Sequence, residues 1–379
     1  MTVITAGTVA LDERICRPGW LATSSGRIVD CGAGAPPRPA DAEFPDSVVV
    51  PGFIDMHVHG GGGASYTDAI GAEIERAAEF HRRHGTTTML ASLVTAAPHD
   101  LLRQVGVLAE MTRRGIVAGI HLEGPWLSSA RCGAHDAAQL RDPDPAEIDS
   151  LLTAADGTIR MVTLAPELPS SKDAITCLLD ADVVVAIGHT DSSYDEAKRA
   201  IESGATVGTH VFNAMRPLHH RDPGPALALL EDPRVTVELI ADGLHVHPAL
   251  VRQVIGTAGP DRVALITDAM AAAGLPDGSF RLGTLEVDVV ERIARVRGMS
   301  TIAGSTATMD QLFRTAVTAL GGTDEALAAA VRMTAATPAR ALRLDGVGRL
   351  SVGLGADLVV LDGDLQVGAV MAGGQWQAD

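Results

Sequence analysis

The chain of 379 residues has few aromatic residues, few lysines and no excess of positive charge. Aromatic residues make up 3% of the sequence, which leaves little for stacking nucleobases. The 30 basic and 47 acidic residues give a net charge of −17 at pH 7, whereas nucleic acids and anionic membranes require a basic face. We therefore expect no nucleic acid and no membrane as a partner. Lysine occurs only as Lys172 and Lys198, so Schiff-base and P-loop chemistry have almost no candidate residues.

Cysteine and long apolar segments are also scarce. The four cysteines form no CxxC pair, the opening residues lack the pattern of a signal peptide, and no run reaches about 18 uninterrupted apolar residues. A reducing compartment with free thiols suits this composition, and we expect a cytoplasmic protein.

What the chain does contain is a strong α/β pattern. With 46% hydrophobic and 20% charged residues, a large core is expected rather than disorder. Eight short β-branched runs alternate with segments of helical length, and this order is typical of right-handed βαβ units that close into a (β/α)₈ barrel. The runs are 48–56, 86–91, 117–122, 160–164, 183–187, 206–209, 235–240 and 263–267, and the helical segments are 71–84, 98–114, 144–155, 172–181, 193–203 and 246–258.

Both ends of the chain alternate like β-strands instead. Residues 1–34 and 349–376 show this pattern, and the Pro-rich segment 33–47 is predicted to be a linker or a surface loop. We predict an α/β protein in which a TIM-like (β/α)₈ barrel carries a small discontinuous β-sandwich domain formed by both termini. The predicted domains are 1–50 with 343–379 for the β-domain, and 51–342 for the catalytic barrel.

The first barrel run ends in a His-x-His motif, His57 and His59. Side chains alternate along a strand, so both imidazoles point the same way, as two ligands of one metal must. Histidine pairs can also be coincidental, or can lie in solvated loops.

Other reactive side chains end four further runs, at Glu123, His189, His210 and Asp268. A single histidine at such a place is more often structural than a ligand, but barrel strand ends converge on one small volume. Imidazole with carboxylate is the ligand set of Zn²⁺ or Fe²⁺ rather than of Mg²⁺ or Ca²⁺. The ligands outnumber those of one tetrahedral site, so two adjacent metals with Glu123 as a bridge are plausible.

The sequence motifs that contain these residues resemble those of a known family. PGFIDMHVHG, GIHLEGPW, GHT, THVFNAM and TDAMAAAG are similar to the amidohydrolase superfamily and, more closely, to the N-acetylglucosamine-6-phosphate deacetylases, from about residue 50 to 340. The resemblance implies metal-dependent hydrolysis of N-acetyl-D-glucosamine 6-phosphate to D-glucosamine 6-phosphate and acetate. The alternatives are an amidohydrolase for another N-acyl sugar or N-acyl amino acid, and a non-catalytic sugar-phosphate-binding barrel.

The resemblance also implies roles for single residues. One or two divalent ions, Zn²⁺ or Fe²⁺, are expected per subunit: one on Glu123, His189 and His210, and a second through His57 and His59. Asp268 is expected as a metal ligand and as the base and acid of catalysis, and His135 as the group that polarises the acetyl carbonyl. The expected sugar-phosphate contacts are Asn213, Ala214, Arg221 and His245, with Arg221 reaching across a homodimer interface.

One loop departs from the family pattern. Cys132 stands where relatives usually carry a basic residue at or near that position. The change could alter a lid or confer sensitivity to thiol oxidation, or it could be a neutral substitution.

Overall fold

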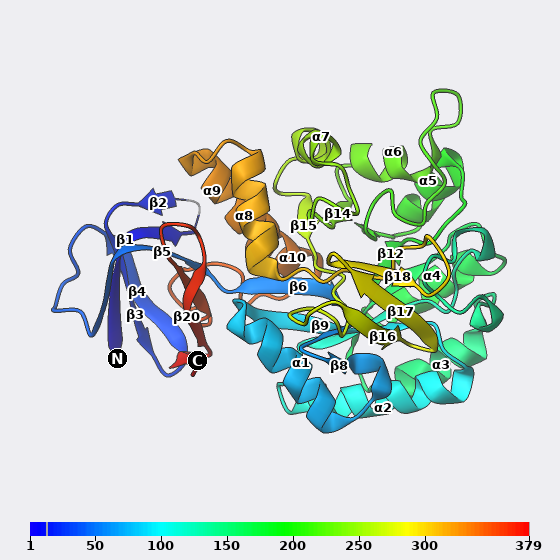
Figure 1. The fold of residues 1–379 in the computed structure, drawn as a ribbon, viewed down its shortest axis with the longest axis horizontal. Coiled ribbons are helices and arrows are strands. Elements are labelled where there is room, and N and C mark those ends of the chain that lie inside the picture. The colour runs from blue at the N-terminus through cyan, green and yellow to red at the C-terminus, as the bar shows by residue number, and fades with distance from the viewer. Residues whose placement is uncertain (13, 379) are drawn as a thin grey trace.

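A computed structural model describes residues 1–12 and 14–378 of the chain. Figure 1 shows two parts: a small β-rich domain that carries both termini, and a larger barrel with helices around it. None of the helices in these residues is long and apolar enough to cross a membrane.

The barrel is built from eight parallel strands that pair in chain order. Between the first and the last strand, the N–H of Asp268 donates to the carbonyl of His57 at 2.9 Å. The predicted (β/α)₈ fold is therefore confirmed. The strands are β6 (Phe53–Val58), β9 (Thr86–Val94), β10 (Gly119–Glu123), β11 (Ile159–Leu164), β12 (Val184–Ile187), β13 (Val207–Gly208), β14 (Thr236–Leu239) and β15 (Val263–Leu265).

Helices cover the outside of the barrel, and their starts show the expected local chemistry. The Asp144 carboxylate accepts the N–H of Ala146 at the start of α3, and Ser193 forms a capping box with Glu196 at the start of α5. Helix α6 was not predicted, because its eight residues GPALALLE lack a polar face. The helices are α1 (Gly71–Arg83), α2 (Pro98–Arg113), α3 (Pro145–Ala155), α4 (Ser171–Asp180), α5 (Tyr194–Glu202), α6 (Gly224–Glu231), α7 (Pro248–Ala258), α8 (Met309–Ala319), α9 (Asp324–Val331) and α10 (Thr337–Ala341).

The terminal domain is one eight-stranded sheet that joins the two ends of the chain. Its order is β21-β20-β19-β5-β1-β3-β4, with β2 paired to β1, so strands from the two termini lie next to each other. Ile28 exchanges backbone hydrogen bonds with Gly353 and Leu354, which brings the N- and C-terminal segments together a second time. The predicted discontinuous β-domain is confirmed. Its strands are β1 (Thr2–Leu11), β2 (Arg14–Cys16), β3 (Gly19–Ser24), β4 (Arg27–Ala33), β5 (Ala42–Pro51), β19 (Leu358–Leu361), β20 (Val367–Ala372) and β21 (Gln375–Trp376).

Two predictions about the segment before the barrel were wrong. Residues 42–47 of the predicted linker 33–47 belong to β5, and the run 48–56 is divided between β5 and β6. Pro45 is accommodated where the pairing of β5 with β1 shifts register. The chain crosses between the domains at Gly52, where a Cβ atom would lie 2.1 Å from the Thr87 hydroxyl, so only glycine fits without displacing that side chain.

A three-stranded antiparallel sheet after β15 was not predicted. It consists of β16 (Gly278–Leu282), β17 (Leu285–Val290) and β18 (Ile293–Val296), and its apolar face packs on Val94 and Met270 beside the strand ends of the barrel. We call it the β16–β18 sheet. A two-stranded ribbon, β7 (Gly60–Gly61) with β8 (Ala64–Ser65), follows the His-x-His motif.

Candidate active site

A cavity of about 280 Å³ opens at the carboxyl ends of the barrel strands. Leu282 and Ile302, at the β16–β18 sheet and the loop after it, form part of its apolar wall. The polar side chains come from the strand ends, as the barrel predicts. Of the predicted site residues, the cavity is lined by His59, Glu123, His135, His189, His210, Asn213, Ala214, His245 and Asp268.

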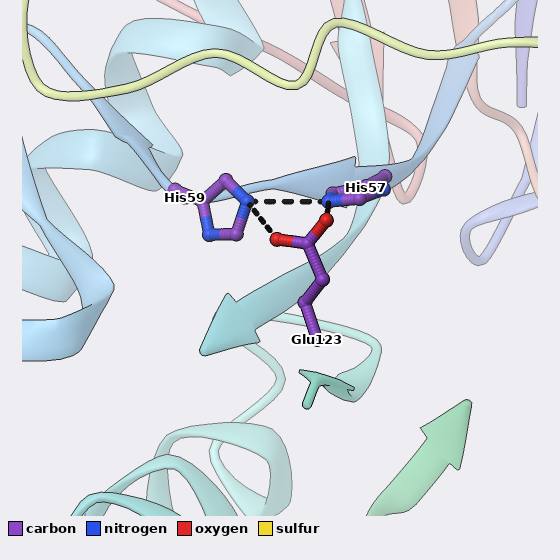
Figure 2. Close-up of side chains that lie close together, drawn as sticks. All are labelled: His57, His59 and Glu123. Atoms are coloured by element: carbon purple, nitrogen blue, oxygen red, sulfur yellow. Dashed lines mark hydrogen bonds and ion pairs between the residues drawn. The ribbon is translucent and has the colours of Figure 1, made fainter. Parts of the chain in front are cut away.

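The His-x-His motif and Glu123 form one compact group, drawn in Figure 2. The two Nε2 atoms of His57 and His59 lie 3.2 Å apart. The Glu123 carboxylate lies 3.5 Å from Nε2 of His57 and 3.2 Å from Nε2 of His59. Strand β6 thus directs both imidazoles toward the carboxylate at the end of β10.

Glu123 also belongs to a second group, with His189 and His210. Its Oε1 lies 3.0 Å from Nε2 of His189 and 2.9 Å from Nε2 of His210, and these two nitrogen atoms are 3.1 Å apart. Both histidines have left-handed backbones, with φ of 46° and 28°. Such angles are rare for residues other than glycine and cluster at functional sites.

Contacts on the far side of the rings orient three of the four imidazoles. Nδ1 of His57 lies 3.0 Å from the carboxylate of Glu238, Nδ1 of His59 lies 3.2 Å from the carbonyl of Ser92, and Nδ1 of His189 lies 3.0 Å from the carbonyl of Arg131. A carbonyl or carboxylate at Nδ1 requires that this atom carry the proton. The lone pair of Nε2 then faces the centre in all three rings.

Converging lone pairs and a shared carboxylate fit a divalent cation. Two neutral imidazole nitrogens at about 3 Å repel each other unless a proton or a metal lies between them, and nitrogen with carboxylate oxygen is a common ligand set of Zn²⁺ and Fe²⁺. Both groups have this composition, with Glu123 in common.

The two carboxylates of the site are held in their ionised form. Burial opposes ionisation of Glu123, but His57, His189 and His135 outweigh it and lower the pKa of Glu123 well below its ordinary range. Burial also opposes ionisation of Asp268, yet its contacts with His59 and His57 lower its pKa to about 2. Both groups are therefore anionic near neutral pH.

The histidines of β6 have raised pKa values. Burial disfavours their protonation, but Glu123 and Glu238 raise the pKa of His57 well above its usual value. Asp268 and Glu123 outweigh burial at His59 in the same way and raise its pKa to about 9. Positive charge at this position is thus strongly favoured.

Asp268 follows β15 and lies against the His-x-His motif. Its Oδ1 is 3.2 Å from Nε2 of His59 and 3.6 Å from Nε2 of His57, and its φ of 49° is again left-handed. Its carbonyl accepts the N–H of Ser305 at 2.7 Å, which fixes this turn.

His135 is placed as a hydrogen-bond donor. Its Nδ1 accepts the backbone N–H of Thr95 at 3.2 Å, so a neutral ring carries its proton on Nε2, which lies 3.3 Å from Glu123. Burial and the neighbouring His189 lower the pKa of His135 to about 4, so the ring is neutral near pH 7.

Three of the four residues that were predicted to bind the sugar phosphate lie together at the cavity. Asn213, Ala214 and His245 line the cavity, whereas Arg221 lies on an exposed loop and does not line it within one chain. Nδ1 of His245 donates to Asp242 at 2.7 Å; burial opposes protonation of His245, but this contact raises its pKa. A protonated His245 can attract an anion.

Cys132 lies in the loop between β10 and α3 and is half-buried. The neighbouring Arg131 guanidinium binds Asp191 at 2.8 Å, so its charge is already partnered. The sequence alone does not show this pairing.

The sequence analysis missed Glu238 and Asp242, which hold His57 and His245. A signal for Glu238 exists, because it is a lone carboxylate within the apolar run of β14 and is fully buried. Buried charges in apolar strands are rare unless they are paired.

Buried imidazoles, a shared carboxylate and an aspartate at the mouth of a (β/α)₈ barrel define a metal-dependent hydrolase of the barrel class. Residues 48–377 match the model of the amidohydrolase family. A solved structure of an N-acetyl-D-glucosamine-6-phosphate deacetylase mutant from Mycobacterium smegmatis, in complex with N-acetyl-D-glucosamine-6-phosphate, is 56% identical, with a TM-score of 0.98 over 99% of this chain and 98% of that one. The N-acetylglucosamine-6-phosphate deacetylase of Homo sapiens is 38% identical over 88% of this chain and 84% of its own length. The N-acetylgalactosamine-6-phosphate deacetylase of Escherichia coli O157:H7 is 36% identical, over 94% and 95%.

The chain therefore belongs to the amidohydrolase family, in its branch of N-acetylglucosamine-6-phosphate deacetylases.

Proposed function

We propose that this protein hydrolyses N-acetyl-D-glucosamine 6-phosphate to D-glucosamine 6-phosphate and acetate. The observation that carries the proposal is the pair of His/His/Glu groups that share Glu123, with Asp268 beside them. Relatives with this printed activity match almost the whole chain.

The site takes one or two divalent cations per subunit, Zn²⁺ or Fe²⁺. Glu123, His189 and His210 would hold one, and His57, His59 and Asp268 would hold a second together with Glu123, which belongs to both groups. A bound cation supplies Lewis-acid chemistry: it favours ionisation of a water and polarises the amide carbonyl.

Asp268 moves the proton. It accepts the proton of the attacking water as the new C–O bond forms at the acetyl carbon, and donates it to the nitrogen as the C–N bond breaks, releasing the amine and acetate. The lowered pKa of Asp268 keeps this carboxylate ionised at neutral pH, so an unprotonated oxygen is available to the water.

His135 stabilises charge on the acetyl oxygen. The ring is neutral near pH 7, lines the cavity and carries its proton on Nε2, 3.3 Å from Glu123, so it donates a hydrogen bond as negative charge develops on that oxygen.

Asn213, the backbone at Ala214, His245 and Arg221 bind the sugar phosphate. Because Arg221 lies outside the cavity of its own chain, we propose that it reaches the site of a second subunit in a homodimer. Short charge-assisted contacts are needed, since a dianion is repelled by a protein of net charge −17.

We further propose a cytoplasmic location, in keeping with four unpaired cysteines, and a role in the breakdown or recycling of amino sugars. We also propose that Cys132, beside the cavity-lining residues Gly133 to His135, lies in a lid loop or acts as a redox-sensitive thiol.

An acetate-release assay tests the activity. The 6-phosphate and free N-acetylglucosamine are compared before and after chelation, and only the 6-phosphate with metal present should be turned over well. Because one relative of similar identity is named for N-acetylgalactosamine 6-phosphate, this epimer is the second candidate substrate and belongs in the same assay. Equal rates with and without phosphate would contradict the proposed phosphate site.

A further inference from the structure

Glu238 is a fully buried carboxylate beneath the site. Its side chain is 0% exposed, and its Oε2 lies 3.0 Å from Nδ1 of His57 and accepts the backbone N–H of His210 at 3.2 Å. It does not line the cavity.

The outer contacts of the four ligand histidines differ in charge. Backbone carbonyls occupy Nδ1 of His59 and His189, and Nδ1 of His210 has no hydrogen-bond partner among the residues that the structure describes. Only His57, of these four, has a carboxylate at Nδ1.

Glu238 would lower the stability of the protein if its role were only structural. Its Oε1 finds no hydrogen-bond partner in the described part of the chain, and a buried carboxylate with an unsatisfied oxygen costs stability unless positive charge lies close by. A neutral glutamine would satisfy the same two contacts through its carbonyl oxygen. The positive charge that offsets Glu238 therefore lies at His57, as a proton on its ring or as a cation at Nε2 on the far side of the ring.

We propose that Glu238 is a positioning residue that strengthens cation binding at the His57 and His59 side of the centre. It fixes the proton of His57 on Nδ1, directs Nε2 at the cation and raises the basicity of that nitrogen. Partners of this kind typically change metal affinity by about 10- to 100-fold. The inference rests on the proposed metal-dependent function, but it concerns affinity at one half of the site.

Calorimetric titration with Zn²⁺ tests the inference on protein stripped by a chelator. Wild type should bind about two ions, and Glu238→Gln should bind one of them about 10- to 100-fold more weakly while the other stays unchanged. Glu147→Gln is the matched control, since Glu147 is a partly buried carboxylate bound to Arg141 outside the site. A Glu238→Gln titration identical to wild type would overturn the inference.

A double-variant cycle separates positioning from a general packing role. If Glu238 acts through His57, then His57→Asn with Glu238→Gln should lose no more affinity than His57→Asn alone. Additive losses would mean that Glu238 acts elsewhere, through the backbone of His210, and would overturn the inference. If circular dichroism shows that Glu238→Gln does not fold, Glu238→Asp replaces it, because it keeps the charge but is one methylene too short to reach His57; wild-type affinity in that variant would equally overturn the inference.

Activity is measured on the same preparations. Glu238→Gln should lower kcat at limiting Zn²⁺ and leave KM for the 6-phosphate unchanged. If wild type releases no acetate from any of the sugars, the proposed function fails, whereas the Zn²⁺ titration still decides the role of Glu238.

Discussion

The two halves of the metal centre share Glu123 but are built in different ways. His57 and His59 come from the end of strand β6, and their alternation along the chain sets their common direction. His189 and His210 sit on left-handed turns, and their direction depends on the loops that hold those turns. The first half is backed by a buried carboxylate at His57 and a backbone carbonyl at His59, and the second by one backbone carbonyl at His189. Under our proposal, charge tunes the first half, whereas backbone geometry tunes the second.

The largest expected effect comes from Asp268, which we propose serves the chemistry as well as the half at His57 and His59. Asp268→Asn should lower kcat by about 10²–10⁴-fold, because an amide cannot accept the proton of water. Elemental analysis should still find metal, since both His/His/Glu groups remain. A variant with the wild-type kcat would show that Asp268 is not the base.

Substitution of the shared residue Glu123 should lower the metal content more than substitution of a histidine from one half. His57→Ala or His59→Ala should lower the metal content from about two ions per subunit toward one, whereas Glu123→Ala should empty the site more completely, because Glu123 serves both groups. Elemental analysis of the purified variants decides this. Unchanged stoichiometry in the histidine variants would exclude a second ion at the His-x-His motif.

A substitution outside both halves should weaken substrate binding without changing the metal content. Arg221→Ala should raise KM for the 6-phosphate by about 10- to 100-fold, or about 1.5–3 kcal/mol, through loss of one charged hydrogen-bonding group. Steady-state kinetics with unphosphorylated N-acetylglucosamine provide the control, which should barely change. An equal loss with both substrates would assign Arg221 to the fold or the dimer.

The smallest effect on the site is expected from a buried carboxylate far from it in the chain. Burial opposes ionisation of Asp310, but contacts with His84, Thr308 and Arg314 outweigh it and lower its pKa from 3.8 to about 2. Its stabilising contribution is therefore present above about pH 4 and is lost as the pH falls toward 2. Asp310→Asn should lower the free energy of unfolding by about 2 kcal/mol at pH 7.

Denaturant unfolding at pH 7 and at pH 2.5 checks this linkage. The difference between wild type and Asp310→Asn should shrink at the lower pH, and metal content should not change. A difference that stays constant with pH would mean that packing, rather than charge, accounts for the loss.

Much of the centre could be predicted from the sequence, because strand ends of a barrel meet at one place. His57 and His59 are set by strand alternation alone, and Glu123 by its position before Gly124 and Pro125. The barrel and the discontinuous terminal domain followed from the same periodicity.

The rest depends on contacts between distant parts of the chain. The left-handed backbones of His189, His210 and Asp268 have no local signal, since none of these residues is a glycine. The partners of His57 and His245 become visible only when β14 and the loop after it lie beside β6 and β15. The β16–β18 sheet alternates in sequence, but it was overlooked beside the stronger barrel pattern.

The pairing of β5 with β19 also sets an order of events during synthesis. Strand β5 lies between β1 and β19 in the terminal sheet, and β19 begins only at Leu358, after the last barrel helix. All the barrel strands are synthesised before β19. The edge of β5 that pairs with β19 therefore stays unpaired while the barrel strands leave the ribosome. Exposed strand edges can pair with other chains, and this edge of the β-domain is therefore open to misassembly until β19 has been synthesised.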